Sequence, residues 1–532
     1  MTILKILGAA FLLLALTGVV IRVLNPLPAL EPRAASSMLT DTSETPLGRG
    51  ASAAANEHPG LTGVHPLNDG RSAFAARTLL ARAATRSLDV QYYIWKGDLS
   101  GTLLLHEMRT AADRGVRVRM LLDDNGVAGL DAQLAAIDQH PGIEVRLFNP
   151  FVVRRPKMIG YLADFRRLNR RMHNKSFTAD NQVTIIGGRN VGDEYFGAQD
   201  DSLFADLDVM AVGPAVSAVS RDFDRYWSSG SAYPAASILD PVGPDQLEAI
   251  RRAAESAMRA PAARSYMDAV RTLPFVDEVE AGTLQFEWAP VQLVSDDPAK
   301  ALGRTGPNGL LTGQLSQILG TPARDVSLVS GYFVPTQAGE DAFVRLARRG
   351  VKVNILSNAL EATDVAVVHA GYARRRKPLL RAGVRLFEMR KVEDQVDRQQ
   401  EHSLFGSGSG RGIGGPGTVI RSSASTLHAK TFSIDRERMF VGSFNFDPRS
   451  MHLNTELGFL IESATLAAAL TTSFETDVPQ RAYEVQLTND GELVWIERDG
   501  SKTIRHTEEP GTTFPQRAFI TVLSYLPIEW LL

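Results

Sequence analysis

HNKSFTAD, residues 173–180, and HAKTFSID, residues 428–435, are two copies of one pattern in a chain of 532 residues. Each copy begins with His-x-Lys, ends in aspartate and is followed by a glycine-led segment that ends in asparagine, GGRN at 187–190 and GSFN at 442–445. Because side chains alternate between the faces of a strand, His-x-Lys places its histidine and lysine on one face. Identical spacing in both copies predicts a duplicated unit and therefore two similar lobes.

The duplication extends to the sequence on either side of the two patterns. AADRGVRVRMLL at 111–122 and LARRGVKVNIL at 346–356 both read as a helix that ends at Arg-Gly and continues into an alternating strand. Strands that alternate with amphipathic helices predict an α/β fold. We expect each lobe to be a mixed sheet flanked by helices, the first over 69–275 and the second over 276–490, with the lobes packed about a pseudo-twofold axis.

Both ends of the chain are apolar. Residues 3–24 would span about 33 Å as a helix, enough to cross a hydrocarbon core of about 30 Å. We expect an N-terminal transmembrane helix within a membrane anchor at 1–30, with a cleaved signal peptide as the alternative, and a flexible linker at 31–68. A C-terminal tail at 491–532 ends in an apolar stretch, 519–532, that fits either a buried helix or contact with a membrane interface.

Composition narrows the chemistry. The formal net charge is −3, whereas chains that bind nucleic acid usually carry a basic excess, so nucleic acid is disfavoured as a partner. The chain has no cysteine, which excludes disulfides, thiolate metal sites and cysteine nucleophiles. No group of His, Asp and Glu shows metal-ligand spacing, and lysines already supply positive charge. We therefore expect neither a metal nor another cofactor.

The duplicated residues suit a phosphodiester substrate. If the copies meet, they assemble two imidazoles, two ammonium groups and two carboxamides, from His173, Lys175, Asn190, His428, Lys430 and Asn445. Lysines and amide donors can stabilise the oxygens of a five-coordinate phosphorus. One histidine can attack the phosphorus while the other protonates the leaving alkoxide.

Each histidine also needs a group that orients its ring. Glu456, which follows the second copy, is the candidate for His428, and Asp206 is the candidate that the first copy offers for His173. The alternative for both is an ordinary surface carboxylate.

The two patterns resemble the H-x-K-x4-D signature of the phospholipase D superfamily. RLNRRMHNK at 167–175, GGRNVGDEYFG at 187–197 and GSFNFDPRS at 442–450 resemble bacterial cardiolipin synthases, in particular their C-type branch. The resemblance implies two phospholipase D-type lobes and metal-free phosphatidyl transfer through a phosphohistidine, with phosphatidylglycerol as acceptor. One departure is Gly188, where the family commonly has serine.

The resemblance also assigns residues and a location. It implies a catalytic set with a phosphate-binding asparagine in each copy, namely His173, Lys175, Asp180 and Asn190 with His428, Lys430, Asp435 and Asn445. It makes His173 the nucleophile, although the two aspartates fit a structural role in the turn better than proton transfer. The expected partners are phosphatidylglycerol, other phospholipids and the bacterial inner membrane. A lipid hydrolase of the same fold is the main alternative, ahead of a nuclease or an inactive scaffold.

Overall fold

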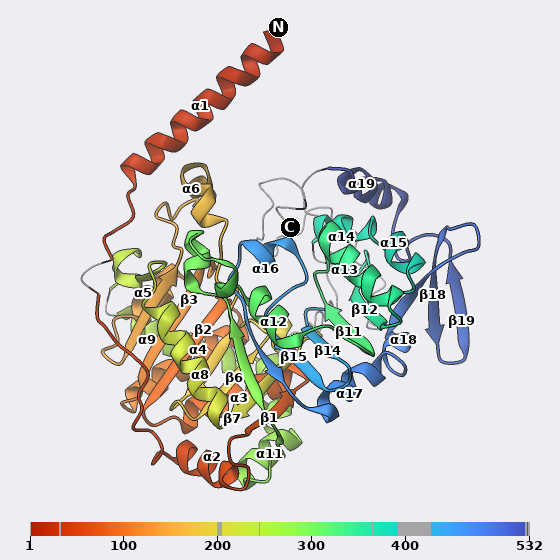
Figure 1. Cartoon of the computed structure of the whole chain (residues 1–532). Coiled ribbons are helices and arrows are strands. Elements are labelled where there is room, and N and C mark those ends of the chain that lie inside the picture. The colour runs from red at the N-terminus through yellow and green to blue at the C-terminus, as the bar shows by residue number, and fades with distance from the viewer. Residues whose placement is uncertain are drawn as a thin grey trace.

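The computed structural model describes residues 2–30, 33–198, 205–243, 245–363, 365–391, 427–526 and 529. Within these residues two mixed sheets lie side by side and helices cover them (Figure 1). This is the two-lobed α/β architecture that the duplicated sequence predicts.

The first sheet is built around the first copy. Its strands β4, β3 and β2 are parallel to one another, and β5, β6 and β7 continue the sheet in antiparallel pairs. In spatial order the strands are β8 (Ala232–Pro234), β4 (Ile143–Phe148), β3 (Arg117–Gly126), β2 (Ser87–Ile94), β5 (Ser176–Ala179), β6 (Val183–Gly187), β7 (Asp208–Val212), β1 (Thr62–Leu67) and β9 (Glu287–Ala289).

The second sheet repeats this order around the second copy and extends it at one edge. Strands β13, β12 and β11 are parallel, and β14, β15 and β16 follow in antiparallel pairs. In spatial order the strands are β10 (Val291–Ser295), β16 (Leu457–Ile461), β15 (Arg438–Gly442), β14 (Lys430–Ile434), β11 (Asp325–Ser330), β12 (Lys352–Asn358), β13 (Arg385–Met389), β17 (Ala482–Leu487), β18 (Leu493–Asp499) and β19 (Lys502–His506).

Helices cover the sheets and close their apolar cores. Those before β10 are α1 (Thr2–Leu24), α2 (Pro46–Asn56), α3 (Gly70–Ala83), α4 (Leu99–Asp113), α5 (Asp131–Ile137), α6 (Gly160–Leu168), α7 (Asp193–Phe196), α8 (Pro214–Trp227), α9 (Asp245–Arg259), α10 (Pro261–Arg271) and α11 (Pro274–Ala281). Those after β10 are α12 (Leu311–Leu319), α13 (Thr336–Arg348), α14 (Ala366–Ala373), α15 (Arg376–Arg381), α16 (Pro448–His452), α17 (Ala464–Ser473), α18 (Val478–Arg481) and α19 (Phe514–Ser524).

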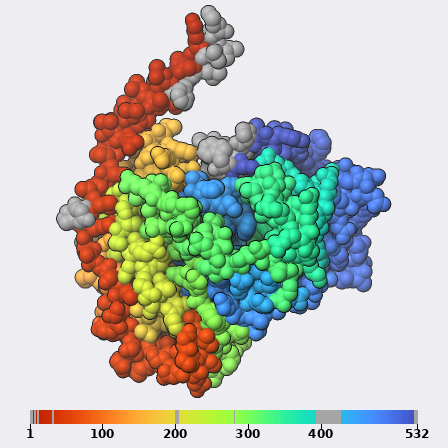
Figure 2. Space-filling view, in the orientation of Figure 1, coloured from red at the N-terminus to blue at the C-terminus, as the bar shows by residue number. Residues whose placement is uncertain are grey.

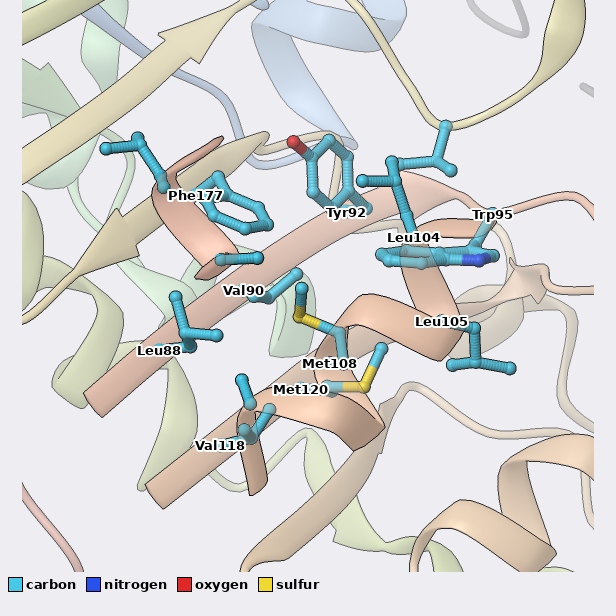
Figure 3. Packing of buried hydrophobic residues seen from close by; sticks show 14 of the residues in the cluster. Leu88, Val90, Tyr92, Trp95, Leu104, Leu105, Met108, Val118, Met120 and Phe177 are labelled. Carbon is cyan, nitrogen blue, oxygen red and sulfur yellow. The ribbon is translucent and has the colours of Figure 1, made fainter. Parts of the chain in front are cut away.

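Packing in the first lobe follows the sequence pattern. Alternate residues of β2 point to one side, where Val90 and Tyr92 belong to the same buried apolar cluster as Met108 of α4 and Met120 of β3 (Figure 3). The side chain of Asp98 caps the N-terminus of α4 by accepting from the backbone N–H of Gly101 at 3.1 Å.

A separate apolar cluster joins the two lobes. Ile186 and Val209 of the first sheet pack with Val441 and Phe459 of the second in one buried group. These residues lie on β6, β7, β15 and β16, the strands next to the two copies. The contact between lobes is therefore a continuous core, which holds the two copies close together.

The lobe boundaries differ from those predicted. The expected linker at 31–68 contains α2 and also β1, which pairs with β7 and β9 inside the first sheet. Glycine and proline in TGVHPL weaken its strand signal, so tertiary pairing decides its structure. The chain passes from β9 of one sheet to β10 of the other near Pro290, and the expected tail at 491–532 supplies β18, β19 and α19.

At the N-terminus α1 projects from the body of the molecule (Figure 1). Across the residues that the structure describes, none of the helices combines the length and the apolar character needed to cross a membrane.

Candidate active site

The two His-x-Lys segments meet where the lobes touch. The backbone N–H of His173 donates to Thr455 of the second lobe at 2.9 Å, and that of His428 donates to Ala205 of the first lobe at 2.8 Å. Isolated parallel bridges pair Met172 with Thr455 and Ala205 with Leu427. Each histidine is therefore held by backbone from the opposite lobe, and the exchange is reciprocal.

The orienting carboxylates are exchanged in the same way, so the prediction of pairing within a lobe is wrong. Nδ1 of His173 lies 2.8 Å from Oε2 of Glu456, and Nδ1 of His428 lies 2.5 Å from Oδ2 of Asp206. The cause is the bridge pattern, because Asp206 and Glu456 each follow the residue that bridges to the other copy. Both carboxylates are fully buried.

The tautomer of His173 follows from its neighbours. Its Nδ1 also lies 3.1 Å from the backbone carbonyl oxygen of Ser443, which can only accept a hydrogen bond. Nδ1 must therefore carry a proton, and in the neutral ring Nε2 keeps the lone pair.

The two lysines lie beside the histidines, as His-x-Lys predicts. Nζ of Lys175 donates to the carbonyl of His173 at 2.5 Å, and Nζ of Lys430 donates to the carbonyl of His428. Burial lowers the pKa of Lys175 to about 7, although Glu456 acts to raise it.

Burial, followed by the charges of the two lysines, lowers the pKa of His173 well below its ordinary value. Burial and then Lys430 lower the pKa of His428 to about 4, against the opposing effect of Asp206. Both imidazoles are therefore neutral at pH 7 in the free protein.

The two carboxylates have different electrostatic environments. Burial raises the pKa of Glu456 to about 7, although Lys175 acts to lower it. Burial also acts to raise the pKa of Asp206, but His428 and then Lys430 hold it well below its usual range. The site therefore has one firmly ionised carboxylate, beside His428, and one that titrates near neutral pH, beside His173.

Two tyrosines that the sequence analysis did not single out stand against the histidines. Tyr93 meets the ring of His173 edge-on with centroids 5.0 Å apart, and Tyr195 meets His428 in the same way at 5.3 Å. Asn190 lies behind the second pair, because its Nδ2 donates to the hydroxyl of Tyr195 at 3.1 Å. Tyr93 lies within β2 and Tyr195 shortly follows the GGRN segment, but tyrosine in such places is usually part of the core.

The two asparagines do not have equal surroundings. Oδ1 of Asn190 accepts from the backbone N–H of Ile94 at 3.1 Å. Oδ1 of Asn445 is buried and has no hydrogen-bond partner among the described residues. A role of either amide in binding phosphate remains a prediction.

The structure does not bring Asp180 and Asp435 to the histidines. They lie beyond the far ends of β5 and β14, with φ of 50° and 56°. Oδ1 of Asp180 accepts backbone N–H groups from Arg86 at 2.8 Å and Ser87 at 2.9 Å, and Oδ1 of Asp435 accepts the equivalent bonds before β11. The two aspartates therefore have a structural role and not the catalytic one that we expected. Each fixes the turn that leads into a parallel strand.

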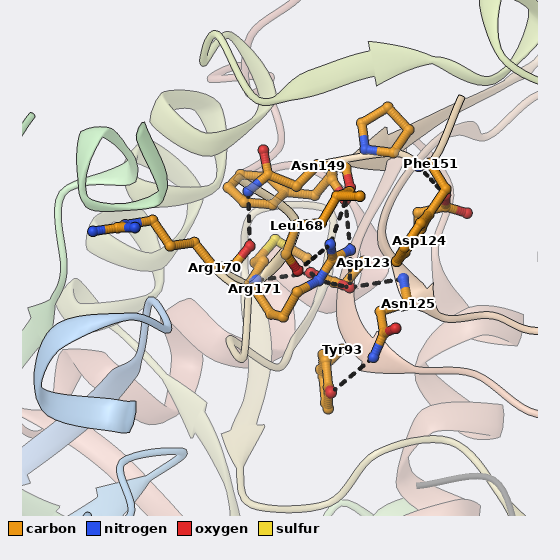
Figure 4. A network of polar contacts seen from close by, with 12 residues as sticks. Tyr93, Asp123, Asp124, Asn125, Asn149, Phe151, Leu168, Arg170 and Arg171 are labelled. Atoms are coloured by element: carbon orange, nitrogen blue, oxygen red, sulfur yellow. Dashed lines mark hydrogen bonds and ion pairs between the residues drawn. The ribbon is translucent and has the colours of Figure 1, made fainter. Parts of the chain in front are cut away.

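A buried ion pair positions the segment before His173 (Figure 4). Nη2 of Arg171 lies 2.6 Å from Oδ1 of Asp123, the residue near the end of β3. Oδ2 of Asp123 also accepts from the backbone N–H of Met172 at 2.8 Å. This ion pair fixes the segment before the first histidine at the carboxyl end of the parallel strands. No pattern in the sequence predicted it.

Gly188, the departure from the family pattern, lies against Asp206. A Cβ at this position would stand 2.1 Å from Oδ1 of Asp206, whereas in the second lobe Ser443 occupies the equivalent position and donates to Glu456 at 2.5 Å. The residue next to the orienting carboxylate is thus a glycine beside an aspartate in one lobe and a serine beside a glutamate in the other.

We expect Gly188→Ala to move the carboxylate of Asp206 away from His428. A displacement of this size should lower kcat by about 10²-fold while the protein stays folded. Steady-state kinetics and thermal unfolding measure the two effects. The matched control is Gly50→Ala, where a Cβ meets nothing within 4 Å. Normal kcat in Gly188→Ala would contradict the need for this close approach.

The donor set at the centre is two carboxylate-bound imidazoles and two ammonium groups. In the described part of the chain, no three or more His, Asp or Glu side chains are grouped so that they could hold a metal ion. Such a set is suited to bind and transfer a phosphodiester, because it offers a nucleophilic nitrogen, a second imidazole for proton transfer and cations for the phosphate oxygens.

Known proteins share this organisation. The family described as "Cardiolipin synthase, PLD-like domain" matches residues 78–227 and 315–478. Cardiolipin synthase C of Escherichia coli is 47% identical over 477 residues, covering 90% of this chain and 98% of that protein. An uncharacterized protein of Helicobacter pylori is 30% identical over 486 residues, covering 91% of this chain and 92% of its own length.

The fold recurs in a distant solved structure. The crystal structure of a phosphatidylserine synthase from Haemophilus influenzae covers 91% of this chain and all of its own, with a TM-score of 0.56 at 12% identity. With the extent of the matches above, these findings confirm the resemblance drawn from the duplicated motifs. The chain belongs to the cardiolipin synthase family with phospholipase D-like domains.

Proposed function

We propose that the chain is a phosphatidyltransferase that makes cardiolipin from phosphatidylglycerol and a second phospholipid through a phosphohistidine. The observation that carries this proposal is the pair of buried histidines, each held at Nδ1 by a carboxylate from the opposite lobe. The relative from Escherichia coli, named cardiolipin synthase C, supports the choice of lipid.

In the first step Nε2 of His173 attacks the phosphorus of the donor lipid. The bond between phosphorus and the headgroup oxygen breaks, and His428 gives that oxygen its proton. The phosphate brings negative charge into the site, which favours the protonated form of His428 beside Asp206. Lys175 and Lys430 stabilise the oxygens of the transition state.

In the second step a hydroxyl of phosphatidylglycerol attacks the phosphatidyl–His173 intermediate. His428, now neutral, takes the proton of that hydroxyl, the new P–O bond forms and the P–N bond to His173 breaks. The product carries two phosphatidyl groups on one glycerol, and the first step has released the headgroup of the donor lipid as its alcohol.

The deciding experiment uses purified full-length chain and defined lipids. Phosphatidylglycerol is supplied alone or together with phosphatidylethanolamine, and the products are identified by mass spectrometry, with and without EDTA. Cardiolipin as the main product in both EDTA arms supports the proposal. Phosphatidic acid as the main product would make the chain a lipid hydrolase, and loss of activity in EDTA would overturn the metal-free mechanism.

The charge of Lys175 should set the alkaline limit of activity. A lysine whose pKa is lowered to about 7 is charged below that pH and loses its proton as the pH rises through it. We therefore expect kcat/KM to fall above about pH 7, since the neutral amine no longer stabilises the phosphate.

Lys175→Arg should move this alkaline limb to higher pH, because arginine stays charged. The measurement is kcat/KM from about pH 5.5 to about pH 9.5, a range that extends to both sides of the lowered pKa of Lys175. Lys352→Arg, on the exposed start of β12, is the control. An alkaline limb that does not move in Lys175→Arg would show that another group controls it.

We further propose that α1 holds the chain at the bacterial inner membrane. Its outer residues include the exposed side chains of Leu12, Leu13, Leu16 and Val20. A chain that begins after residue 30 should keep both lobes and lose tight association with membranes. Recovery of the full-length gene product as a soluble protein without its first thirty residues would favour the signal-peptide alternative.

A further inference from the structure

Large exposed apolar side chains outside α1 gather on two helices, one in each lobe. Leu162 and Phe165 of α6 are 52% and 43% exposed. Val522 and Tyr525, on α19 and at its end, are 63% and 83% exposed. Outside α1, α6 and the segment 514–526, the only other such residues in the described part of the chain are Met258 and Ile504.

One side of α19 packs on α14, and among the described residues another side stays exposed. Ile520 is buried against Ala366 and Ala370 of α14, with Leu523 partly buried beside them. Phe519 and Val522, at helical spacing, stay exposed on another side of the helix, whereas its polar residues are Gln516, Arg517, Thr521 and Ser524. Large apolar side chains that stay exposed together on a surface helix mark a surface that meets something apolar.

Both helices are attached to the segments that carry the histidines. In the first lobe α6 ends at Leu168, and His173 follows shortly after it in the sequence. On the second lobe α19 packs on α14, which follows β12, and Asn358 at the end of β12 exchanges two hydrogen bonds of 2.9 and 2.8 Å with Leu427, the neighbour of His428. The two helices therefore stand on the same side of the sheets as the site.

The figures show this common side. Helices α6 and α19 lie at the same edge of the molecule, with α16 between them (Figure 1). In the space-filling view the orange surface of α6 and the violet-blue surface of α19 both form the upper boundary of the body (Figure 2). Helix α1 leaves from this edge and packs against α6, where its Gly18 lies close to the backbone of Leu162.

The charged residues next to α6 indicate what binds to this apolar surface. Arg155 and Arg166 are exposed, Arg170 lies next to Arg166 beside Gly303, and Arg304 follows that glycine. Among the described residues none of these four arginines has a carboxylate within ion-pair distance, although the whole chain has a net charge of −3. An apolar surface with an unpaired basic border matches a bilayer of anionic phospholipid, which offers acyl chains inside and phosphates at the surface.

We infer that α6 and α19 form a membrane-docking rim, made by Leu162, Phe165, Phe519, Val522, Tyr525 and Leu526, that seats the side of the molecule carrying the site on an anionic phospholipid bilayer. The inference rests on the proposed function, because a phosphatidyltransferase must receive its lipids from the bilayer. The rim adds a second attachment beside α1, one that orients the lobes rather than merely tethering them.

The absence of cysteine makes the test direct. Phe165→Cys and Val522→Cys are prepared in the full chain, labelled with an environment-sensitive fluorophore and mixed with phosphatidylglycerol vesicles that contain a nitroxide-labelled lipid. Ile504→Cys, on β19, is the matched control. We expect a blue shift and strong quenching at 165 and 522 and neither change at 504. Equal quenching at all three positions, or none at 165 and 522, would overturn the rim.

Activity gives the second readout. Phe165→Ser with Val522→Ser should lower turnover on vesicles by about tenfold or more, because each change removes apolar area from the contact. Turnover of a dispersed short-chain phosphatidylglycerol should stay unchanged, since the histidines are untouched. Equal loss on both substrates would refute the docking role. Failure of the unmodified chain to make cardiolipin from the short-chain lipid would instead refute the proposed function.

Discussion

Alanine at His173 or at His428 is expected to abolish measurable phosphatidyl transfer, with a loss of about 10³-fold or more for each single variant. A covalent route needs both a nucleophile and an acid, and the two rings form one site between the lobes. The double variant should be no worse than the single variants, because residues that act as a unit do not contribute additively. The measurement is initial rate with phosphatidylglycerol for the three variants at matched folding stability.

The roles of the two histidines can be separated with a donor lipid that carries a good leaving group. His428→Ala should still form a covalent phosphatidyl adduct with such a donor, since proton transfer to the leaving group is no longer required. His173→Ala should form none. Mass spectrometry of the trapped protein detects the adduct, and an adduct on His428 in the His173→Ala variant would reverse the assignment. Substantial transfer by either single variant would refute a shared site.

Asp206→Asn and Glu456→Gln are expected to lower kcat by about 10²- to 10⁴-fold, because a neutral amide does not stabilise the positive charge that develops on the imidazole. The exchange of carboxylates between lobes makes a sharper prediction. Asp206→Asn, in the first lobe, should behave like a variant of His428 and should recover activity with the good leaving group. Glu456→Gln, in the second lobe, should behave like a variant of His173 and should not recover.

Pairing within each lobe would give the opposite pattern, so the experiment tests the geometry as well as the chemistry. Glu107→Gln is the control, since Glu107 pairs with Arg82 at the surface, 2.5 Å away. If both carboxylate variants recover equally with the activated donor, the carboxylates do not act through separate histidines.

Local pattern was enough to predict the centre of the molecule. His-x-Lys has a defined meaning on a strand, and repetition at fixed spacing reveals the duplication without any knowledge of contacts. Both lysines accordingly lie beside their histidines, and the fold class follows from the alternation of helices and strands.

The features that could not be predicted from the sequence depend on pairing between residues far apart in the chain. The partners of His173 and His428 lie 283 and 222 residues away in the chain, and either carboxylate was chemically suitable for either ring. Strand β1 likewise owes its place to backbone bonds with β7 and β9 rather than to its own residues. Nothing in a local window distinguishes such alternatives.

The reciprocal backbone exchange between the lobes has the geometry of an isologous dimer interface, in which the same patch serves both partners. In a dimer of identical subunits the two histidines would have identical surroundings. Covalent fusion removes that constraint, since each half can then mutate alone. Gly188 with Asp206 on one side and Ser443 with Glu456 on the other are differences that a symmetric dimer of identical subunits could not have. Joining the halves in one chain thus permits a fixed division of labour, in which one histidine bonds to phosphorus and the other handles the proton.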